Sequence, residues 1–363
     1  MQPPVRYATH IEVPADDEAE TIKGLLDALH GILETTSENY CHAVRSVHAK
    51  SHGLIAVQFE VLPDLPAELA QGLFAHPGTF DALLRISTNP GDILPDSISL
   101  PRGIALKVTG VDGERLPGAT DGQTQDFVMV NGPSINAKDP ASFLKSLQLV
   151  AQTTDRATWA KVALSAVLRG TEKALEAVGG ESAVLKGLGG ARNVHPLGET
   201  YFSQTAFRHG DYIAKYQIAP VSPQLTQLTG VEIDARGEPD AIRHVVDADM
   251  AGGGTWEFRV QLCRGAQTMP VEDASVLWSE DQSPFQTVAR LHAAPQRGWS
   301  DARAAIVDET MRFTVWTGLE VHRPLGAINR VRQATYDMSA EFRQTFNRCP
   351  IHEPVRIELA EGR

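Results

Sequence analysis

Alternation of apolar and polar residues is the feature that most limits what this 363-residue chain can fold into. Residues 54–62 and 104–109 repeat with the period of two that half-buried β-strands show. Residues 212–218 and 256–262 form a second strand-like block, rich in aromatic and branched side chains. We therefore predict that the segment from about 45 to 135 is mostly antiparallel strand and that more strands follow later in the chain.

Helical periodicity marks both ends of the chain and one internal segment. Residues 22–33 place leucine and isoleucine at the three- and four-residue spacing of an amphipathic helix. The last element, roughly 328–348, looks helical too, and residues 141–190 show helical spacing before glycine pairs break it. No internal repeat and no linker rich in proline or serine divides the sequence. We therefore predict a single α+β domain over 1–363, with 141–190 as a helical insertion.

Composition and charge argue against several classes of partner. The sequence has 33 Lys and Arg against 45 Asp and Glu, a formal charge of -12, without blocks of like charge, which disfavours a nucleic-acid or anionic-membrane surface. It has no uninterrupted apolar run of about 18 residues and no signal-like N-terminus, so we expect a cytoplasmic protein. Three widely spaced cysteines predict neither a disulfide framework nor a CxxC metal site, and the glycine runs match no nucleotide-binding pattern.

The C-terminal helix carries the first candidate for chemistry. Arg332, Tyr336 and Arg343 stand at i, i+4 and i+11, a spacing that brings all three side chains to one helix face. A guanidinium one turn away favours the phenolate form of a tyrosine, and tyrosinate is one of the known axial ligands of haem iron. The same spacing also fits a solvated helix face with the tyrosine ring packed on the core, so this motif needs support from elsewhere.

Support comes from four further motifs that precede this helix. They are Arg45-Ser46-Val47-His48-Ala49-Lys50, Arg85-Ile86-Ser87-Thr88, Pro101-Arg102-Gly103-Ile104-Ala105-Leu106-Lys107, and Asn131-Gly132-Pro133 followed by Lys138-Asp139. Together with the Arg332–Tyr336 motif they occur in the same order as in the haem catalases, which the sequence resembles over residues 45–343. The resemblance implies an α+β fold in which an antiparallel eight-stranded β-barrel and surrounding helices enclose haem b.

The resemblance also implies roles on the distal side of the haem. His48 would accept the proton of iron-bound hydroperoxide, Asn131 would donate a hydrogen bond to the same peroxide, and Ser87 would orient the other ring nitrogen of His48. From the residues alone, His48 fits a structural strand histidine, and Asn131 fits a turn in an Asn-Gly-Pro sequence. His48 and His52, at i and i+4, would suit zinc on a helix, but their context predicts a strand.

The cofactor itself would be held from both sides. The binding residues that the resemblance implies are Arg45, Val47, Arg85, Arg332, Tyr336 and Arg343. Among them Tyr336 is the expected axial ligand of the haem iron, and the arginines at 45, 85 and 343 are expected to pair with the haem propionates, because a guanidinium group suits a carboxylate. Taken singly, each of these arginines also fits an ordinary surface ion pair.

The residues after the distal asparagine bear on the choice of reaction. Typical catalases have an aromatic pair there that walls a narrow channel, whereas this chain has Ser134, Ile135 and Asn136. A more open and polar pocket admits larger molecules. We therefore expect a haem-dependent peroxidase that reduces hydrogen peroxide or organic peroxides through ferryl haem, with a small organic electron donor and weak catalase activity.

Three other functions remain open at this stage. They are a full catalase, an isomerase of fatty-acid hydroperoxides similar to allene oxide synthase, and a haem-binding protein without turnover. Much of the N-terminal arm and the C-terminal helical domain of full-length catalases has no counterpart in the sequence, and a homodimer is one option for its assembly.

Overall fold

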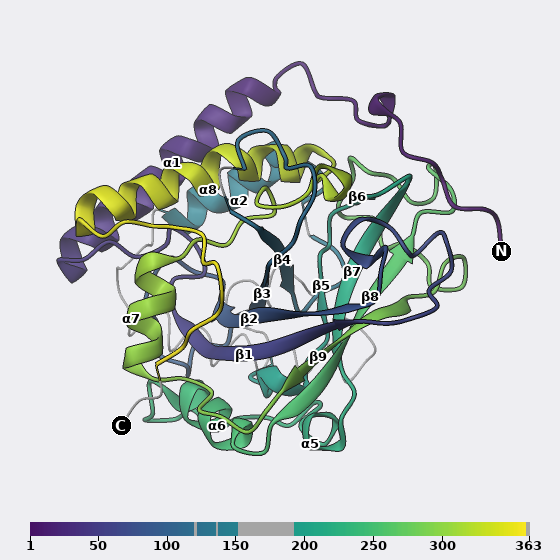
Figure 1. Cartoon of the computed structure of the whole chain (residues 1–363). Helices are drawn as coiled ribbons and strands as arrows, with labels where there is room; N and C mark the ends of the chain where they lie inside the picture. The colour runs from purple at the N-terminus through teal and green to yellow at the C-terminus, as the bar shows by residue number, and fades with distance from the viewer. Residues whose placement is uncertain (120–121, 136, 152–191, 361–363) are drawn as a thin grey trace, which may run out of the picture.

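A closed β-barrel forms the centre of the computed structural model, which describes residues 1–119, 122–135, 137–151 and 192–360 (Figure 1). The strands are β1 (Ser51–Val61), β2 (Gly78–Thr88), β3 (Arg102–Thr109), β4 (Thr124–Val130), β5 (Tyr201–Phe202), β6 (Phe207–His209), β7 (Tyr212–Pro220), β8 (Gly254–Leu262) and β9 (Gln286–Ala293). Their order is β5-β4-β3-β2-β1-β9-β8-β7, and β5 pairs with β7 to close a ring of eight, beside which β6 is added. All strand pairings are antiparallel, so the predicted eight-stranded barrel is confirmed.

Aromatic side chains fill the barrel interior. The ring centroids of Phe59, Phe127 and Tyr216 lie 4.7–5.7 Å from that of Phe258, and all four residues are buried. Such rings bring large apolar areas and prefer tilted or edge-to-face contacts. The strands that supply them form because alternate residues point inward, as the period of two predicts. With its interior packed in this way, the barrel offers space for a ligand elsewhere.

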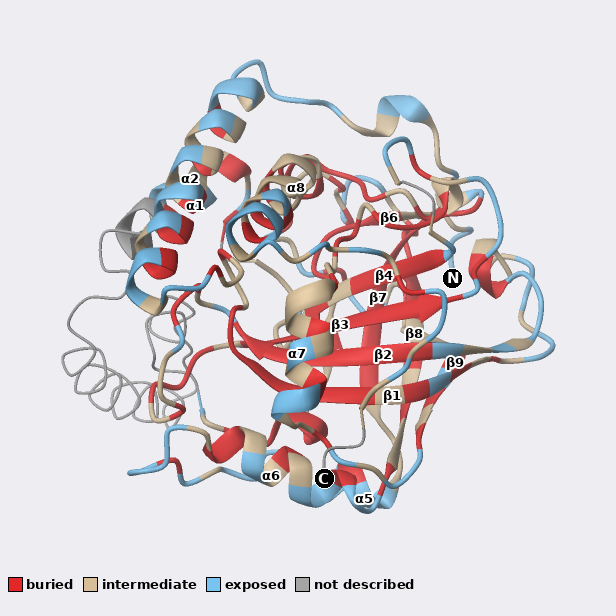
Figure 2. Cartoon of the chain, turned by 60° about the vertical axis from the view of Figure 1, so that its left-hand side comes forward, coloured by how far each residue is buried: buried red, intermediate tan, exposed pale blue. Residues whose placement is uncertain are grey.

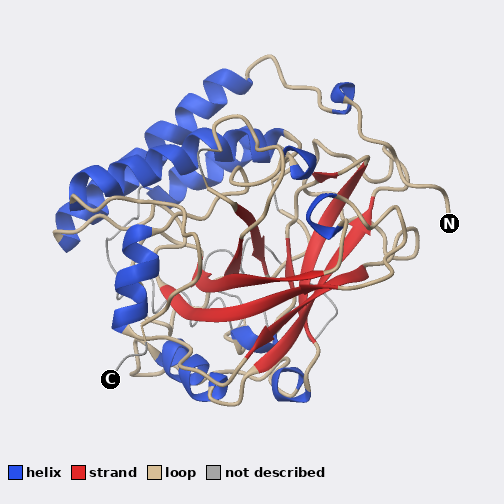
Figure 3. Ribbon diagram, in the orientation of Figure 1, coloured by secondary structure: helices blue, strands red, loops and turns tan. Residues whose placement is uncertain are grey.

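Helices cover one side of the barrel (Figures 1 and 3). The helices are α1 (Glu18–Tyr40), α2 (Pro140–Ala151), α5 (Pro223–Thr226), α6 (Ala241–Met250), α7 (Asp301–Thr310) and α8 (Ala327–Asn347), with 3-10 turns at Thr9–Ile11, Gly72–Phe74, Pro196–Gly198 and Glu320–His322. Leu25 and Leu29 of α1, Leu147 of α2 and Val331 of α8 share one apolar cluster. The predicted first and last helices are therefore confirmed. Of the predicted helical insertion, only the part within α2 belongs to the described residues.

The outer face of β3 differs from the expectation of a half-buried strand. All eight residues of this strand are buried, as the colouring of Figure 2 shows for much of the barrel wall. The side chain of Lys107 points outward, and its Nζ lies 2.7 Å from Oδ1 of Asp126 and 2.5 Å from Oε2 of Glu353. All three side chains are shielded from solvent. Phe313 also packs over its ammonium group. The chain after α7 and the C-terminal segment cover this face, which local periodicity could not reveal.

Candidate active site

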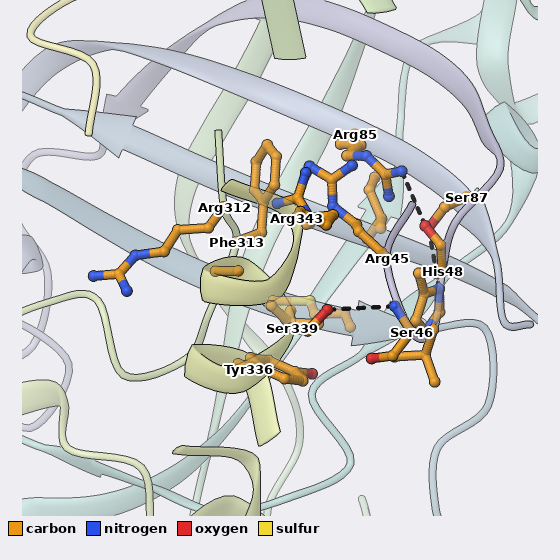
Figure 4. Close-up of a pocket in the computed structure, with 17 residues that line it drawn as sticks. Arg45, Ser46, His48, Arg85, Ser87, Arg312, Phe313, Tyr336, Ser339 and Arg343 are labelled. Atoms are coloured by element: carbon orange, nitrogen blue, oxygen red, sulfur yellow. Dashed lines mark hydrogen bonds between the residues drawn. The ribbon is translucent and has the colours of Figure 1, made fainter. Parts of the chain in front are cut away.

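A pocket lies between the barrel wall β2-β3-β4 and helix α8 (Figure 4). Two rows of directly opposed residues build the wall, namely Arg85-Ala105-Val128 and Ser87-Gly103-Val130. Opposed residues on neighbouring antiparallel strands point to the same face of a sheet. Their neighbours along the strands, such as Ile86 and Ile104, pack into the barrel interior. The pocket therefore faces the outside of the barrel, and its empty volume is about 610 Å³.

Most of the predicted site residues meet in this pocket, although they come from distant parts of the chain. Those that line it are Arg45, Val47, His48, Arg85, Ser87, Tyr336 and Arg343. A hydrogen bond of 3.3 Å from the backbone N–H of Ser46 to the hydroxyl of Ser339 ties the loop before β1 to α8. Asn131 and Arg332 are the two predicted residues that are not among the lining residues.

The imidazole of His48 lies flat against the barrel wall. Its Nδ1 is 3.0 Å from the hydroxyl of Ser87, the partner that the sequence motif predicts. A Cβ atom on Gly103 would come within 2.4 Å of the ring, so only glycine leaves room for it there. The backbone of His48 has a φ of 54° and donates its N–H to the carbonyl of Asn89. The ring is therefore held on three sides, and its Nε2 is left for another partner.

The surroundings of His48 keep its ring neutral. Burial, and after it the positive charges of Arg85, Arg332 and Arg45, together lower the pKa of His48 to about 3. A neutral imidazole with one nitrogen engaged by a hydroxyl can accept a proton at the other. His48 is thus neutral at neutral pH, and Nε2 is the ring nitrogen not engaged by Ser87.

Three predicted arginines converge on the end of α7. Arg45 and Arg85 both donate to Oδ1 of Asp308, at 2.9 and 2.7 Å. Arg343 donates to the backbone carbonyls of Asp308 and Met311. The other carboxylate oxygen of Asp308 accepts a 2.6 Å hydrogen bond from the hydroxyl of Ser51. Asp308, which the sequence motifs do not single out, is therefore the residue around which this cluster is arranged.

Among the described residues, the three arginines of this cluster bond to one carboxylate, that of Asp308, and Glu309 lies near Arg45 and Arg343. Burial raises the pKa of Asp308, but Arg85 and Arg45 lower it more, so that it stays ionised. Burial and the charge of Arg85 lower the pKa of Arg343 to about 10, which still leaves it cationic at neutral pH. The Nε–H of Arg343 is buried and has no acceptor among the described residues. A buried donor without a partner is costly, which points to an anion that would complete this site.

Tyr336 lines the pocket from α8 (Figure 4). Arg332 lies one helical turn before it on the same helix. Arg332 donates to the amide oxygen of Asn329 at 3.1 Å and to the hydroxyl of Thr205 at 3.4 Å. Both acceptors are neutral, and no described carboxylate forms an ion pair with Arg332. No described carboxylate therefore neutralises the charge of Arg332, which shares α8 with Tyr336.

Asn131 does not meet His48 in the structure. Its backbone continues the β3–β4 pairing opposite Arg102, which puts its side chain on the same face as Ile104 rather than Gly103. Its amide donates to Glu199 at 2.7 Å and accepts the backbone N–H of Arg102 at 2.8 Å. The expected distal role of Asn131 is therefore not supported by its geometry, because strand parity turns the side chain to the other face of the wall.

The segment after Asn131 is held by a glutamine that the sequence does not single out. The amide of Gln204 donates to the carbonyls of Gly132 and Ser134, at 2.9 and 2.8 Å. Ser134 and Ile135 are half-buried, and Asn136 lies outside the described residues.

Two residues that bond to the predicted arginines could not be found from local sequence. Asp308 is one of several acidic residues in α7, and nothing in its spacing distinguishes it from Glu309, which pairs with His42 near the surface. Asn329 has no motif either, although its buried amide makes hydrogen bonds to Ala206, Leu325, Thr205 and Arg332. Gly103 could have been found, because it lies within the Pro101–Lys107 motif. Asp308 and Asn329 matter because of contacts with residues far away in the sequence, and such contacts leave no spacing pattern near them.

The described residues offer no alternative metal site built on His48 and His52. His48 lies in a loop and His52 in β1, where its Nε2 is 3.1 Å from the hydroxyl of Thr88. No group of three or more His, Cys, Asp or Glu side chains among the described residues could hold a metal ion.

Among the described residues, no helix is both long enough and apolar enough to cross a membrane.

Comparison with known proteins identifies the fold. No protein-family model and no curated protein sequence matches the chain. A solved fungal catalase is similar with a TM-score of 0.57 and 15% identity, over 88% of this chain and 63% of that one. Catalase A from Saccharomyces cerevisiae is similar with a TM-score of 0.57 and 17% identity, over 96% of this chain and 69% of that one. The chain thus spans about two thirds of each, and its fold is similar to that of these two catalases, as its motifs predict.

Proposed function

We propose that this protein binds haem b in the pocket beside α8 and acts as a haem-dependent peroxidase. Its substrates would be hydrogen peroxide or organic peroxides, with a small organic molecule as electron donor. Tyr336 would be the axial ligand of the iron, and His48 the base on the opposite side. The catalase fold and the arrangement of the predicted residues in one pocket support this proposal. A cytoplasmic location and a homodimer remain predictions.

The charge of the pocket is the observation that carries the proposal. Arg45, Arg85 and Arg343 line it, Arg332 lies one helical turn from Tyr336, and Asp308 is the only described carboxylate that bonds to any of these four. Arg312 lines the pocket too, but its charge is paired with Asp337 and Glu353. These four arginines therefore keep an excess of positive charge over the carboxylates near them, even with Glu309 close to Arg45 and Arg343. Two propionates and one tyrosinate would supply three negative charges and the ferric porphyrin core one positive charge, so haem b bound through Tyr336 would offset much of this excess.

Unsatisfied donors and the apolar wall agree with this assignment. The buried Nε–H of Arg343 would find an acceptor in a propionate oxygen. Ala105 and Val128 offer small and apolar surface beside the arginines, which suits the flat apolar face of a macrocycle.

His48 would move the proton that the reaction needs. Bound haem would supply the iron that takes up peroxide and the capacity to store two oxidising equivalents. His48, kept neutral and oriented by Ser87, would accept the peroxide proton at Nε2 and return it to the departing oxygen. Overall, ROOH + AH2 gives ROH + H2O + A, where the O–O bond breaks and the donor AH2 loses two electrons and two protons.

Stopped-flow spectroscopy of the haem-loaded protein tests this function. Hydrogen peroxide should change the haem spectrum rapidly, and a phenolic donor should restore the starting spectrum while the donor is oxidised. Oxygen release without a donor would instead favour a catalase, and rearranged product without a donor would favour a hydroperoxide isomerase. A fully loaded protein that does not react with peroxide would exclude all three enzymes.

Replacing Tyr336 with phenylalanine tests the axial ligand. We expect Tyr336→Phe to lose the spectrum of a tyrosinate-bound ferric haem and to bind haem about 10- to 100-fold more weakly, because the iron loses its anionic ligand. Absorption spectra of the ferric protein measure the first effect. Titration of haem into apoprotein that has been unfolded and refolded measures the second. Tyr7→Phe, which alters a tyrosine outside the pocket lining, is the matched control. An unchanged ferric spectrum in Tyr336→Phe would show that another residue binds the iron.

The pH dependence of the peroxide reaction tests the state of His48. The pKa of His48 is lowered to about 3, so the base form persists from about pH 5 to pH 8. We expect the second-order rate constant for peroxide to be flat over this range and to fall only as the pH approaches 3. Stopped-flow measurements in buffers of constant ionic strength give the profile. A decline centred near the ordinary histidine pKa of about 6.5 would contradict this environment.

A further inference from the structure

A hydrogen-bonded chain leads from an arginine of the pocket to a tryptophan outside it. The Nε–H of Arg85, which lines the pocket, donates to Oδ1 of Asp308 at 2.7 Å. The other carboxylate oxygen, Oδ2, accepts the hydroxyl of Ser51 at 2.6 Å, and the oxygen of this hydroxyl accepts the Nε1–H of Trp299 at 3.0 Å. Trp299 is half-buried and is not among the residues that line the pocket. Successive hydrogen bonds therefore join its indole to the pocket wall.

The two ends of the chain fix the direction of its hydrogen bonds. An indole N–H can only donate, and an ionised carboxylate can only accept. Asp308 stays ionised, since burial raises its pKa less than the charges of Arg85 and Arg45 lower it. The buried hydroxyl of Ser51 must therefore accept from the indole and donate to the carboxylate. The indole proton thus has a path to Asp308 through one hydroxyl group.

The other tryptophans of the described residues have no such path. In each of them the Nε1–H donates to a backbone carbonyl, and they are Trp256, Trp278 and Trp316. A carbonyl group has no proton of its own to pass on. Trp159 lies outside the described residues. Among the described tryptophans, Trp299 is therefore the one whose indole donates to a group that can relay a proton.

A guanidinium group lies on the indole ring of Trp299. The Cζ atom of Arg243 is 4.1 Å from the ring centroid, and its Nε–H donates to the backbone carbonyl of Ser51 at 2.9 Å. This cation is attracted to a neutral indole but repels a positively charged one. An indole that loses an electron beside Arg243 is therefore driven to lose its Nε1 proton as well, and Ser51 is the group that receives it.

We propose that Trp299 is an electron-entry site, through which one-electron donors too large for the pocket reduce the cofactor that the pocket holds. This inference rests on the proposed haem peroxidase, whose peroxide is the oxidant. Trp299 gives one electron toward the pocket, and its Nε1 proton passes to Oγ of Ser51 as the hydroxyl proton passes to Oδ2 of Asp308. An electron from the donor then restores the indole, and both protons return.

The overall reaction balances with two donor molecules for each peroxide. For a one-electron donor D, ROOH + 2 D + 2 H+ gives ROH + H2O + 2 D+, where the O–O bond breaks and the two protons come from solvent. Reduced cytochrome c is a suitable probe, because it carries one electron and is a protein too large to enter the pocket. Its basic surface also suits a chain with a formal charge of -12.

The first test compares two donors in the haem-loaded full-length protein. Reduced cytochrome c and a small phenol are each oxidised with hydrogen peroxide, and the ratio of their rate constants is measured. We expect Trp299→Phe to lose most of the oxidation of cytochrome c relative to that of the phenol, because a phenyl ring has no N–H and gives up an electron much less readily. Trp316→Phe alters another half-buried tryptophan that lies under an arginine, so it is the matched control and should keep the ratio of the unaltered protein.

Electron paramagnetic resonance tests the same step without a donor. Samples are frozen directly after addition of hydrogen peroxide, and ring-deuterated tryptophan identifies the radical. A tryptophan radical should form in the unaltered protein and in Trp316→Phe, but not in Trp299→Phe. Ser51→Ala keeps the indole and removes the proton acceptor, so it should lower the radical signal per bound haem and slow the oxidation of cytochrome c by about 100-fold.

The outcomes separate this inference from the proposed function. An unaltered protein that does not react with peroxide overturns both. An unaltered protein that oxidises the phenol, but neither oxidises cytochrome c nor forms a tryptophan radical, overturns the role of Trp299 alone. Equal donor ratios and equal radical signals in Trp299→Phe and the unaltered protein overturn it as well. If Trp299→Phe fails to hold haem, the same two measurements on Ser51→Ala decide.

Discussion

Replacement of His48 with alanine should slow the reaction with peroxide by about 100- to 10,000-fold while haem remains bound. The imidazole is the one neutral base in the described pocket, since Ser87 is a weak base and the arginines are cationic. Without it, the peroxide proton must leave to water, and the departing oxygen must leave without a proton. The rate constant is measured by stopped flow at about pH 7, with haem content determined from the same samples.

Two further variants make this result specific. Ser87→Ala should lower the rate constant for peroxide much less than His48→Ala does, because it removes only the hydrogen bond that orients Nδ1 of His48. His244→Ala alters an exposed histidine on α6, far from the pocket lining, and should leave the rate unchanged. If haem-loaded His48→Ala reacts as fast as the unaltered protein, the base lies elsewhere and the proposed mechanism is wrong.

Replacement of Lys107 with methionine should lower the free energy of unfolding by about 3–5 kcal/mol. Lys107 is fully buried between the carboxylates of Asp126 and Glu353, so its removal leaves two acidic groups facing each other away from water. Burial already raises the pKa of Asp126 to about 7, with Lys107 acting against this rise. Urea unfolding followed by tryptophan fluorescence measures the loss.

The same variant has a predictable dependence on pH. Without Lys107, the buried carboxyl groups can remain in the folded protein most easily when they are protonated, whereas they ionise freely in the unfolded chain. The loss of stability in Lys107→Met should therefore be larger at about pH 8 than at about pH 5. Lys23→Met, at an exposed position on α1, should change stability by less than about 0.5 kcal/mol at either pH. A small effect of Lys107→Met at both pH values would mean that water reaches this ion-pair cluster.

Sequence periodicity and motifs predicted much of the architecture. The alternation in residues 54–62 predicted β1, because every second side chain of a strand points inward, and the spacing in residues 328–348 predicted α8. The motifs also predicted the contact between Ser87 and His48, which lie 39 residues apart. Such predictions succeed where a residue's role depends on the strand or helix that carries it.

The misplacement of Asn131 shows where this reasoning fails. An asparagine at the end of β4 fits the motif, but the side-chain direction changes with every residue along a strand. The pairing of Val130 with Gly103 gives Val130 the outward direction of Gly103 and turns Asn131, the next residue, toward Glu199. Only the register of two strands decides this, and register depends on pairing between distant segments.

The sequence by itself determined that Tyr336 shares a helix face with Arg332 and Arg343, since the rise and turn of a helix fix that relation locally. Only the tertiary structure decided which side chains from other parts of the chain surround this helix face. It gathered the arginines around Asp308, left Arg332 with neutral partners, and placed His48 over Gly103. The reason is physical: charge balance and burial depend on side chains brought together from remote positions, and no local spacing encodes them.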